Sequence, residues 1–237
     1  HPHQGHRMSK PFPLTLRVLA HLLSYPDTSL RDHLAEMTTA LQGERALRPD
    51  RLAELSALMQ HLRGARAMDV EAHYVETFDR GRGTALHLFE HVHGDSRDRG
   101  PAMIDLLQTY EQAGLYLAPS ELPDHLTVVL EYASTQPPAQ ARAFLRELTH
   151  ILQAIFSALL RRESPYASVL AAVLELAGEK AQAVKIPDEP TLDESWEEPA
   201  VFGGCSTQGQ ASPGQPQPIQ IVRAAARQAS TQPGASA

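Results

Sequence analysis

Hydrophobic residues recur through most of the chain at spacings of three and four, which places them on one face of an α-helix. The segments with this spacing end repeatedly at Gly or Pro, the residues that most often terminate helices. No run of alternating β-branched residues indicates a strand, and no repeat period is visible. The pattern predicts an all-α fold, a single globular multi-helix bundle of about eight to ten helices within residues 11–183.

Each expected helix is defined by an apolar face and by the residues that start or end it. In the first half these are Leu16–Leu23 before Pro26, Leu30–Leu41 with a capping box at Ser29 and Asp32 and an end near Gly43, Leu52–Leu62, and Val70–Phe78 capped by Asp69. In the second half they are Met103–Tyr110 after Pro101, Leu122–Ala133 before Pro137, the long pattern Phe144–Leu159, and Tyr166–Val173 with Ser164 as N-cap and Pro165 as first residue.

The periodicity ends near Pro187, where Pro, Gly, Gln, Ser and Ala begin to dominate. Such a composition buries too little apolar surface to offset chain entropy, so residues 184–237 are expected to be a mostly disordered tail. An acidic island around Trp196 interrupts it. Residues 1–10 are expected to be a leader or a tag remnant, because a His-rich stretch precedes Met8.

The composition excludes several classes of protein. A formal charge of −7 argues against a nucleic-acid-binding protein, which would carry a basic surface. No apolar run approaches the roughly 20 residues of a membrane span. There is no signal-peptide pattern, and the single cysteine, Cys205, excludes an internal disulfide. We therefore expect a cytoplasmic protein without membrane insertion.

The segment 84–100 concentrates titratable residues around a short apolar island, which indicates a partly exposed recognition surface. Its first part, His87-Leu88-Phe89-Glu90-His91, also matches the H-x-x-E-H motif of zinc peptidases. On a helix the two histidines would share a face as zinc ligands, with Glu90 as the base. No motif selects a third ligand among Glu111, Glu121 and Glu131, and Gly94 would end such a helix within a turn. A zinc metallopeptidase using residues 87–91 stays open as the alternative, as does an adventitious metal site.

A second polar stretch runs from Glu121 to Tyr132. Pro123 is expected to begin a helix, which would make Asp124 an acid of the first turn, a favourable position near the positive end of the helix dipole. Sequence patterns do not assign this stretch a further role.

These two stretches carry a resemblance to a known family. The run from Phe78 to Arg82 and the run from His87 to Gly100 resemble the signature of the NarJ family, the nitrate reductase assembly chaperones also called the delta subunit. The run Glu121-Leu122-Pro123-Asp124-His125-Leu126 with Glu131-Tyr132 is similar to a motif shared with the wider TorD/DmsD chaperones, and the Trp196 island also resembles NarJ sequences.

The resemblance implies a TorD-like helical fold and a chaperone rather than an enzyme. Such a protein binds the apo catalytic (alpha) subunit of respiratory nitrate reductase, partly through the N-terminal segment of that subunit. It assists insertion of the molybdenum cofactor (bis-molybdopterin guanine dinucleotide) and an iron–sulfur cluster, delays docking to the membrane subunit, and holds no permanent cofactor or metal. We expect a monomer or weak homodimer. The residues expected to bind the partner are His87, Glu90, His91, His93, Asp95, Arg97, Asp98, Arg99, Asp124, His125, Glu131 and Tyr132.

Overall fold

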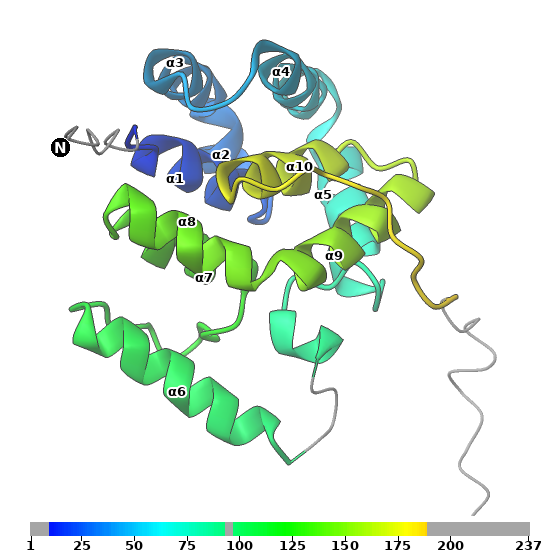
Figure 1. The fold of residues 1–237 in the computed structure, drawn as a ribbon. Helices are drawn as coiled ribbons and strands as arrows, with labels where there is room; N and C mark the ends of the chain where they lie inside the picture. The colour runs from blue at the N-terminus through cyan, green and yellow to red at the C-terminus, as the bar shows by residue number, and fades with distance from the viewer. Residues whose placement is uncertain (1–9, 93–96, 189–237) are drawn as a thin grey trace, which may run out of the picture. The chain divides into compact units, whose positions relative to one another are not determined.

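A computed structural model describes residues 10–92 and 97–188. This part of the chain contains ten α-helices and no strand longer than an isolated bridge, which confirms the all-α prediction (Figure 1). The helices are α1 (Pro13–Leu22), α2 (Thr28–Asp32), α3 (Leu34–Glu44), α4 (Pro49–Gly64), α5 (Ala67–Tyr74), α6 (Arg99–Gln112), α7 (Leu126–Ser134), α8 (Pro138–Glu147), α9 (Thr149–Arg161) and α10 (Ala167–Leu176). A π-helical turn, Val75–Asp79, extends α5, and a 3₁₀ turn, Leu88–His91, precedes α6.

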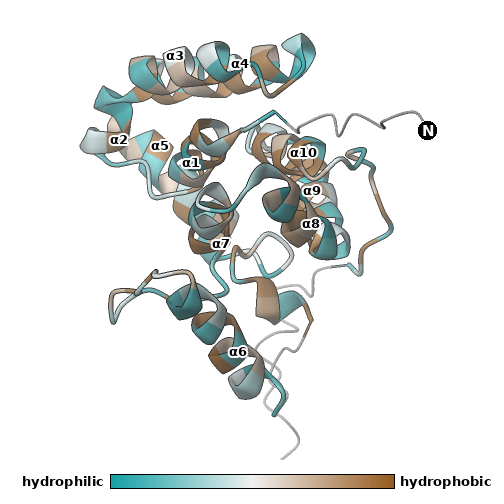
Figure 2. Cartoon of the chain, turned by 60° about the vertical axis from the view of Figure 1, so that its left-hand side comes forward, coloured by the Kyte–Doolittle hydropathy of each residue, from teal (hydrophilic) through white to brown (hydrophobic). Residues whose placement is uncertain are grey.

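The core lies where α1 and α10 meet the surrounding helices. Helix α1 packs against α7 and α3, and α10 packs against α9, α4 and α8. Helix α10 is the most completely buried helix, because eight of its ten residues, all apolar, are buried. Brown apolar positions concentrate on α7, α9 and α10 in Figure 2. Leu126 and Leu130 of α7, expected to be buried, are both 0% exposed.

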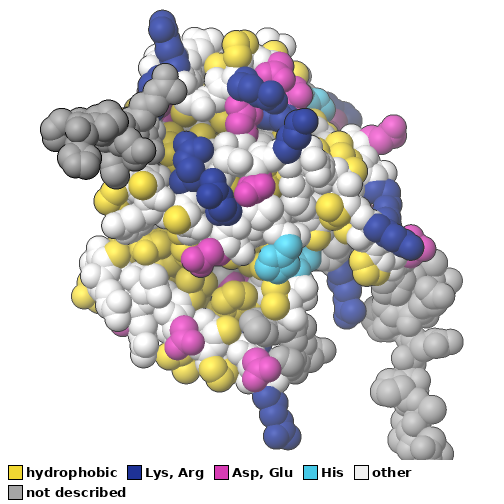
Figure 3. Space-filling view, viewed as in Figure 1, with side chains coloured by type: hydrophobic (Ala, Val, Ile, Leu, Met, Phe, Trp, Pro, Cys, Tyr) yellow, Lys and Arg dark blue, Asp and Glu magenta, His cyan; other side chains and the backbone are white. Residues whose placement is uncertain are grey.

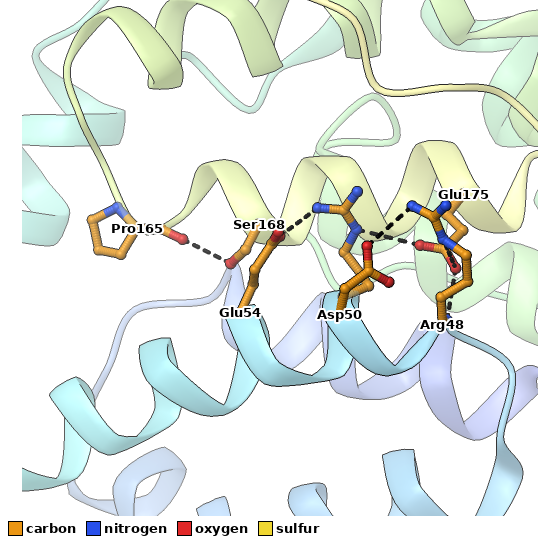
Figure 4. A network of polar contacts seen from close by, with 7 residues as sticks. Arg48, Asp50, Glu54, Pro165, Ser168 and Glu175 are labelled. Atoms are coloured by element: carbon orange, nitrogen blue, oxygen red, sulfur yellow. Dashed lines mark hydrogen bonds and ion pairs between the residues drawn. The ribbon is translucent and has the colours of Figure 1, made fainter.

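A half-buried charged network ties the start of α4 to the end of α10 (Figure 4). The Glu175 carboxylate accepts hydrogen bonds from the backbone N–H of Arg48 at 2.7 Å and from Nε of Arg51 at 3.3 Å. Arg51 also pairs with Glu54 on the exposed side. Because Arg48 precedes the first residue of α4, Glu175 satisfies a backbone donor that the helix itself leaves open.

After α10, the segment 180–188 runs along α9 and is held by three α9 side chains spaced four residues apart. Gln153 donates from its amide nitrogen to the Lys180 carbonyl at 2.6 Å and accepts from the Gln182 N–H at 2.9 Å. Ser157 accepts from the Val184 N–H at 2.8 Å. Arg161 donates to the carbonyls of residues 186 and 187. One face of α9 therefore binds the backbone of this segment.

Two helices predicted as continuous are each broken. The predicted helix from Ser29 to Gly43 is divided into α2 and α3 at His33, and the N-cap is Asp27, whose side chain accepts from the Leu30 N–H at 2.8 Å. The long pattern from Phe144 to Leu159 is divided into α8 and α9, which differ in direction by 67°. The hydroxyl of Thr149 donates to the Arg146 carbonyl at the break, and such local bonds compete with helix continuation.

Three predicted helix starts were also wrong by a few residues. Helix α7 begins at Leu126 rather than at Pro123, and α10 begins at Ala167 rather than at Pro165, although the Ser164 hydroxyl still accepts from the Tyr166 N–H at 3.3 Å. Helix α5 begins before Asp69, which lies in its first turn. These shifts follow from loop contacts that the apolar period does not encode.

Within the described ranges no single helix is long and apolar enough to cross a membrane, whereas the bent pair α8–α9 passes that test of length and composition when taken together. The predictions for residues 1–9, for the tail beyond residue 188 and for the Trp196 island lie outside the described residues.

Candidate functional site

The two polar stretches identified in the sequence lie side by side in the fold. An antiparallel bridge joins His87 to His125. The Leu88 N–H donates to the Asp124 carbonyl at 3.0 Å, and the Leu126 N–H donates to the Leu86 carbonyl at 2.9 Å. Segments 35 to 40 residues apart in the chain therefore form one structural unit, which we call the bridge site and define as residues 84–91 and 123–126.

Asp124 is the buried centre of the bridge site, with an exposed fraction of 0%. One carboxylate oxygen, Oδ2, accepts from the Phe89 N–H at 3.0 Å, and Oδ1 faces Nδ1 of His87 at 3.6 Å. The carboxylate thus supplies an acceptor to the first turn of the Leu88–His91 3₁₀ helix from another part of the chain. The expectation that Asp124 is a first-turn acid of its own helix was wrong, because α7 begins two residues later.

The charges of Asp124 and His87 stabilise each other. The Asp124 carboxylate, whose Oδ1 lies 3.6 Å from Nδ1, raises the pKa of His87, and this effect outweighs the opposing effect of burial. Burial acts to raise the pKa of Asp124, but interaction with His87 and the Phe89 N–H outweighs it, so that this pKa is lowered. Both shifts favour the ionised pair.

His125 has the opposite electrostatic character although its ring lies edge-on to that of His87, with centroids 4.8 Å apart. It is the N-cap of α7, and its Nδ1 accepts from the Thr127 N–H at 3.3 Å. Burial lowers the pKa of His125, and the neighbouring His87 lowers it further. The neutral ring is therefore favoured, since protonation would remove the acceptor and place two cations together.

Short-range contacts fix the start of the bridge site. The buried Thr84 hydroxyl donates to the Thr77 carbonyl, and His91 donates from Nε2 to the Ala85 carbonyl at 2.7 Å. Gly81 leaves room for this turn, because a Cβ atom there would lie 2.4 Å from the Thr84 hydroxyl and 2.5 Å from the Arg162 guanidinium. The segment following α5 is thus held in one conformation.

This geometry does not support the zinc peptidase alternative. The motif residues do not lie on a regular α-helix: His87 precedes a single 3₁₀ turn, and His91 ends it. The His87 ring is directed at Asp124, whereas His91 is bonded to the backbone. No group of three or more potential ligand side chains that could hold a metal occurs among the residues that the structure describes.

Several other predicted residues surround the bridge site at the surface. Glu90 and Arg99 lie 3.9 Å apart, with side chains 41% and 31% exposed. Arg97, Asp98 and Glu131 are exposed, and Tyr132 is half-buried. His93 and Asp95 lie outside the described residues. Among the predicted residues, direct contacts join His87, Asp124 and His125, and they place Arg99 beside Glu90. Asp124 is buried, whereas Arg97, Asp98 and Glu131 are exposed.

Comparison with known proteins identifies the family. Residues 27–172 match the family model described as nitrate reductase delta subunit. The chain belongs to this family.

Its relatives in the delta subunit family are named as chaperones. The chain is 41% identical over 198 residues to "Nitrate reductase molybdenum cofactor assembly chaperone NarJ" of Escherichia coli K12, which covers 79% of this chain and 84% of NarJ. It is 36% identical to "Probable nitrate reductase molybdenum cofactor assembly chaperone NarW" of the same strain, over 78% of this chain and 82% of NarW. The predicted family and the chaperone role are confirmed, and these relatives are not named as enzymes.

A solved structure shows the same fold. It is described as a redox enzyme maturation protein from Archaeoglobus fulgidus, with 20% identity and a TM-score of 0.50 over 71% of this chain and 94% of that protein. At this identity the likeness concerns the arrangement of helices, and it agrees with the predicted fold class.

Sequence patterns did not identify the surface that α6 presents beside the bridge site. Helix α6 buries only Tyr110, whose hydroxyl donates to the Pro123 carbonyl at 2.8 Å, while Met103, Leu106 and Leu107 are half-buried. Apolar side chains gather along the junction between α6 and the helices above it in Figure 3. Two exposed large apolar residues of the described part of the chain belong to this surface: Ile104 on α6, and Tyr116 four residues beyond its end.

A small cavity of about 80 Å³ opens between the end of α6 and α7. Its walls are Tyr110 and Tyr132, whose ring centroids are 4.9 Å apart, with Tyr116 at the rim. The carboxylates of Glu121 and Glu131 also line it. An apolar cavity with acidic neighbours is suited to an apolar side chain that lies next to a cationic one. In the sequence, Glu121 and the Glu131-Tyr132 pair belonged to the second polar stretch, but nothing placed them beside Tyr110.

Proposed function

We propose that this protein is the chaperone that binds the apo catalytic subunit of respiratory nitrate reductase. In this role it assists insertion of the molybdenum cofactor and an iron–sulfur cluster, and it delays docking of the catalytic subunit to the membrane until loading is complete. The observation that carries the proposal is the 41% identity to NarJ over 84% of that chaperone. The metal groups are cargo for the partner, so the chaperone needs no resident cofactor site.

The partner surface that we propose consists of the exposed residues around α6 and α7. Glu131, Tyr132 and the adjoining 80 Å³ cavity would receive an apolar side chain and a neighbouring cation of the catalytic subunit's N-terminal segment. Arg97 and Arg99 would bind carboxylates, because a guanidinium forms paired hydrogen bonds with them. The exposed Ile104 on α6 and Tyr116 after it add contact area of the kind that marks interaction surfaces.

Asp124, His87 and His125 have a different part in this proposal. Asp124 is inaccessible to a partner, so its contribution is to hold the 88–91 turn in place through the Phe89 N–H and His87. His125 fixes the start of α7 and hence the position of Glu131 one and a half turns later. These are positioning residues, and Glu90, His91 and the neighbouring arginines form the contact surface.

The first test measures loading of the enzyme. Nitrate reductase would be produced with and without this chain in a host that lacks its own chaperone of this family, and molybdenum and iron would be measured in the purified catalytic subunit. We expect molybdenum content to fall at least tenfold without the chain. Equal molybdenum content in the two preparations would show that the proposed function is wrong.

The second test measures binding by calorimetry, with a synthetic peptide of the catalytic subunit's N-terminal segment. Glu131→Lys and Arg97→Ala should each weaken binding by about tenfold or more, as expected for loss of a desolvated charged contact. Glu147→Lys on α8 and Arg63→Ala on α4 are matched controls at exposed positions elsewhere, and they should bind like the unmodified chain. If the site variants and the controls bind equally well, the partner surface lies elsewhere.

A further inference from the structure

A groove centred on Tyr25 lies at the junction of α1, α2, α3 and α5, outside the bridge site. Tyr25 lines two adjoining hollows of about 410 and 600 Å³. Leu30 and Met37 form the apolar part of the first, and Ala72, Val75 and Met68 form that of the second. We call this surface the Tyr25 groove.

Tyr25 is an exposed aromatic residue held in a fixed position. Its side chain is 46% exposed, yet its ring packs edge-on against Tyr74 with centroids 5.7 Å apart. Tyr74 is itself buried, and its hydroxyl donates to the Leu23 carbonyl at 2.6 Å. Pro26 restricts the backbone of Tyr25 further. An aromatic side chain that is already ordered loses little entropy when a partner covers it.

Met68 adds adaptable apolar surface at the edge of the groove. It is 77% exposed, although methionine is usually buried in a soluble protein. Its unbranched thioether side chain can fit apolar partners of different shapes. A fixed aromatic ring and a flexible Met therefore flank the same hollow.

The rim of the groove is acidic. Four carboxylates line the two hollows, those of Asp27, Glu36, Glu71 and Glu76, and Arg80 is the one guanidinium among the lining residues. Arg80 pairs with Glu76 at 3.3 Å, and Asp27 caps α2. Glu71 interacts with the Tyr25 hydroxyl, and Glu36 interacts with His33. In the described part of the chain neither carboxylate forms an ion pair with Lys or Arg, so both can receive a cation of a partner.

We propose that the Tyr25 groove binds an amphipathic helix that presents apolar residues flanked by Lys or Arg. Apolar side chains one helical turn apart would enter the hollows on the two sides of Tyr25, as in other complexes of a helix with a groove. Lysine or arginine on the helix flanks would pair with Glu36 and Glu71. This inference is independent of the identity of the client enzyme.

The probe is a synthetic Leu/Lys peptide of about 18 residues, long enough for roughly five helical turns, with Leu at positions i, i+3, i+4 and i+7. A Leu/Glu peptide of the same pattern is the charge control. Fluorescence anisotropy with the full chain should show binding of the Leu/Lys peptide and at least tenfold weaker binding of the Leu/Glu peptide. Equal affinity for both peptides would overturn the proposed charge selection.

Variants of the chain locate the binding site. Tyr25→Ala should weaken Leu/Lys binding by about tenfold or more, since exposed aromatic residues at the centre of an interface carry much of its affinity. Met68→Ala should weaken it without lowering the melting temperature, which separates binding from folding. Leu160→Ala is the matched control, an apolar residue 44% exposed on α9. If Tyr25→Ala and Met68→Ala both bind the Leu/Lys peptide like the unmodified chain, the proposal is wrong.

A charge exchange completes the test. The double variant Glu36→Lys with Glu71→Lys should prefer the Leu/Glu peptide, whereas Glu147→Lys with Glu163→Lys, at exposed positions on α8 and after α9, should keep the original preference. Retention of the Leu/Lys preference by the groove double variant would contradict the proposal. Because these experiments contain no nitrate reductase, their failure would leave the enzyme-loading result unaffected.

Discussion

Asp124 shows how one residue links two motifs that the sequence presents separately. Asp124→Ala should lower the free energy of unfolding by about 2–4 kcal/mol, because the Phe89 N–H loses its acceptor and His87 loses its counter-charge. Asp105→Ala, at an exposed position on α6, should change it by less than about 0.5 kcal/mol. Urea denaturation of the two variants decides the matter, and similar stability would mean that Asp124 is not structurally required.

The pH dependence of stability gives a second prediction at this scale. The raised pKa of His87 means that its stabilising contribution is fully present below about pH 6.5 and is lost as pH rises through the folded-state pKa. The lowered pKa of Asp124 means that its contribution is present above about pH 4 and is lost as pH falls further. The stability lost in His87→Asn should therefore be greatest between about pH 4 and 6.5.

Denaturation of the unmodified chain and His87→Asn at pH 3, 5.5 and 8.5 checks this window. His150→Asn is a control, because His150 is an exposed residue in the first turn of α9, outside the bridge site. A difference between His87→Asn and the unmodified chain that is the same at all three pH values would contradict the ion-pair interpretation.

At the scale of helices, the sequence predicted correctly those features that depend on the spacing of apolar residues. The faces of α1, α4 and α7 were predicted because their buried residues recur within one helix, as Leu126 and Leu130 do. The helix breaks at His33 and Leu148 were not predicted, because the spacing of apolar residues continues through each of them. Asp124 was misplaced because its partner, the Phe89 N–H, lies 35 residues away in the chain.

The charged network between α4 and α10 allows a prediction about how two helices are held together. Glu175→Ala should lower the free energy of unfolding by about 1–3 kcal/mol, because it removes the acceptor for the Arg48 N–H and leaves the half-buried Arg51 with fewer partners (Figure 4). Glu54→Ala also removes a partner of Arg51, but at a 50% exposed position, and should cost less than about 1 kcal/mol. If the two variants lose the same free energy of unfolding, the contact between α4 and α10 contributes no more to stability than the exposed pair does.

For the molecule as a whole, the segment 180–188 determines where the chain can be shortened without loss of stability of the helical domain. The domain boundary at residue 183 stays a prediction, and the bonds from α9 extend to Ile186 and Pro187. A chain ending at residue 188 should melt at the same temperature as the full chain, because every buried apolar residue that the structure describes lies between Phe12 and Ala177. A chain ending at residue 179 should melt about 3–10 °C lower, since Gln153 and Ser157 lose their backbone partners.

A substitution in α9, made in both the longer and the shorter chain, tests whether the segment 180–188 stabilises the domain through its hydrogen bonds to α9 or only by adding length. Gln153 is 9% exposed, and its amide bonds the segment through both the Lys180 carbonyl and the Gln182 N–H. Gln153→Ala should therefore destabilise the chain ending at 188 by about 1–3 kcal/mol, and the chain ending at 179 by much less, because the partners are already absent. If Gln153→Ala costs the same in both chains, the segment does not stabilise α9 through these hydrogen bonds, and the domain is complete without it.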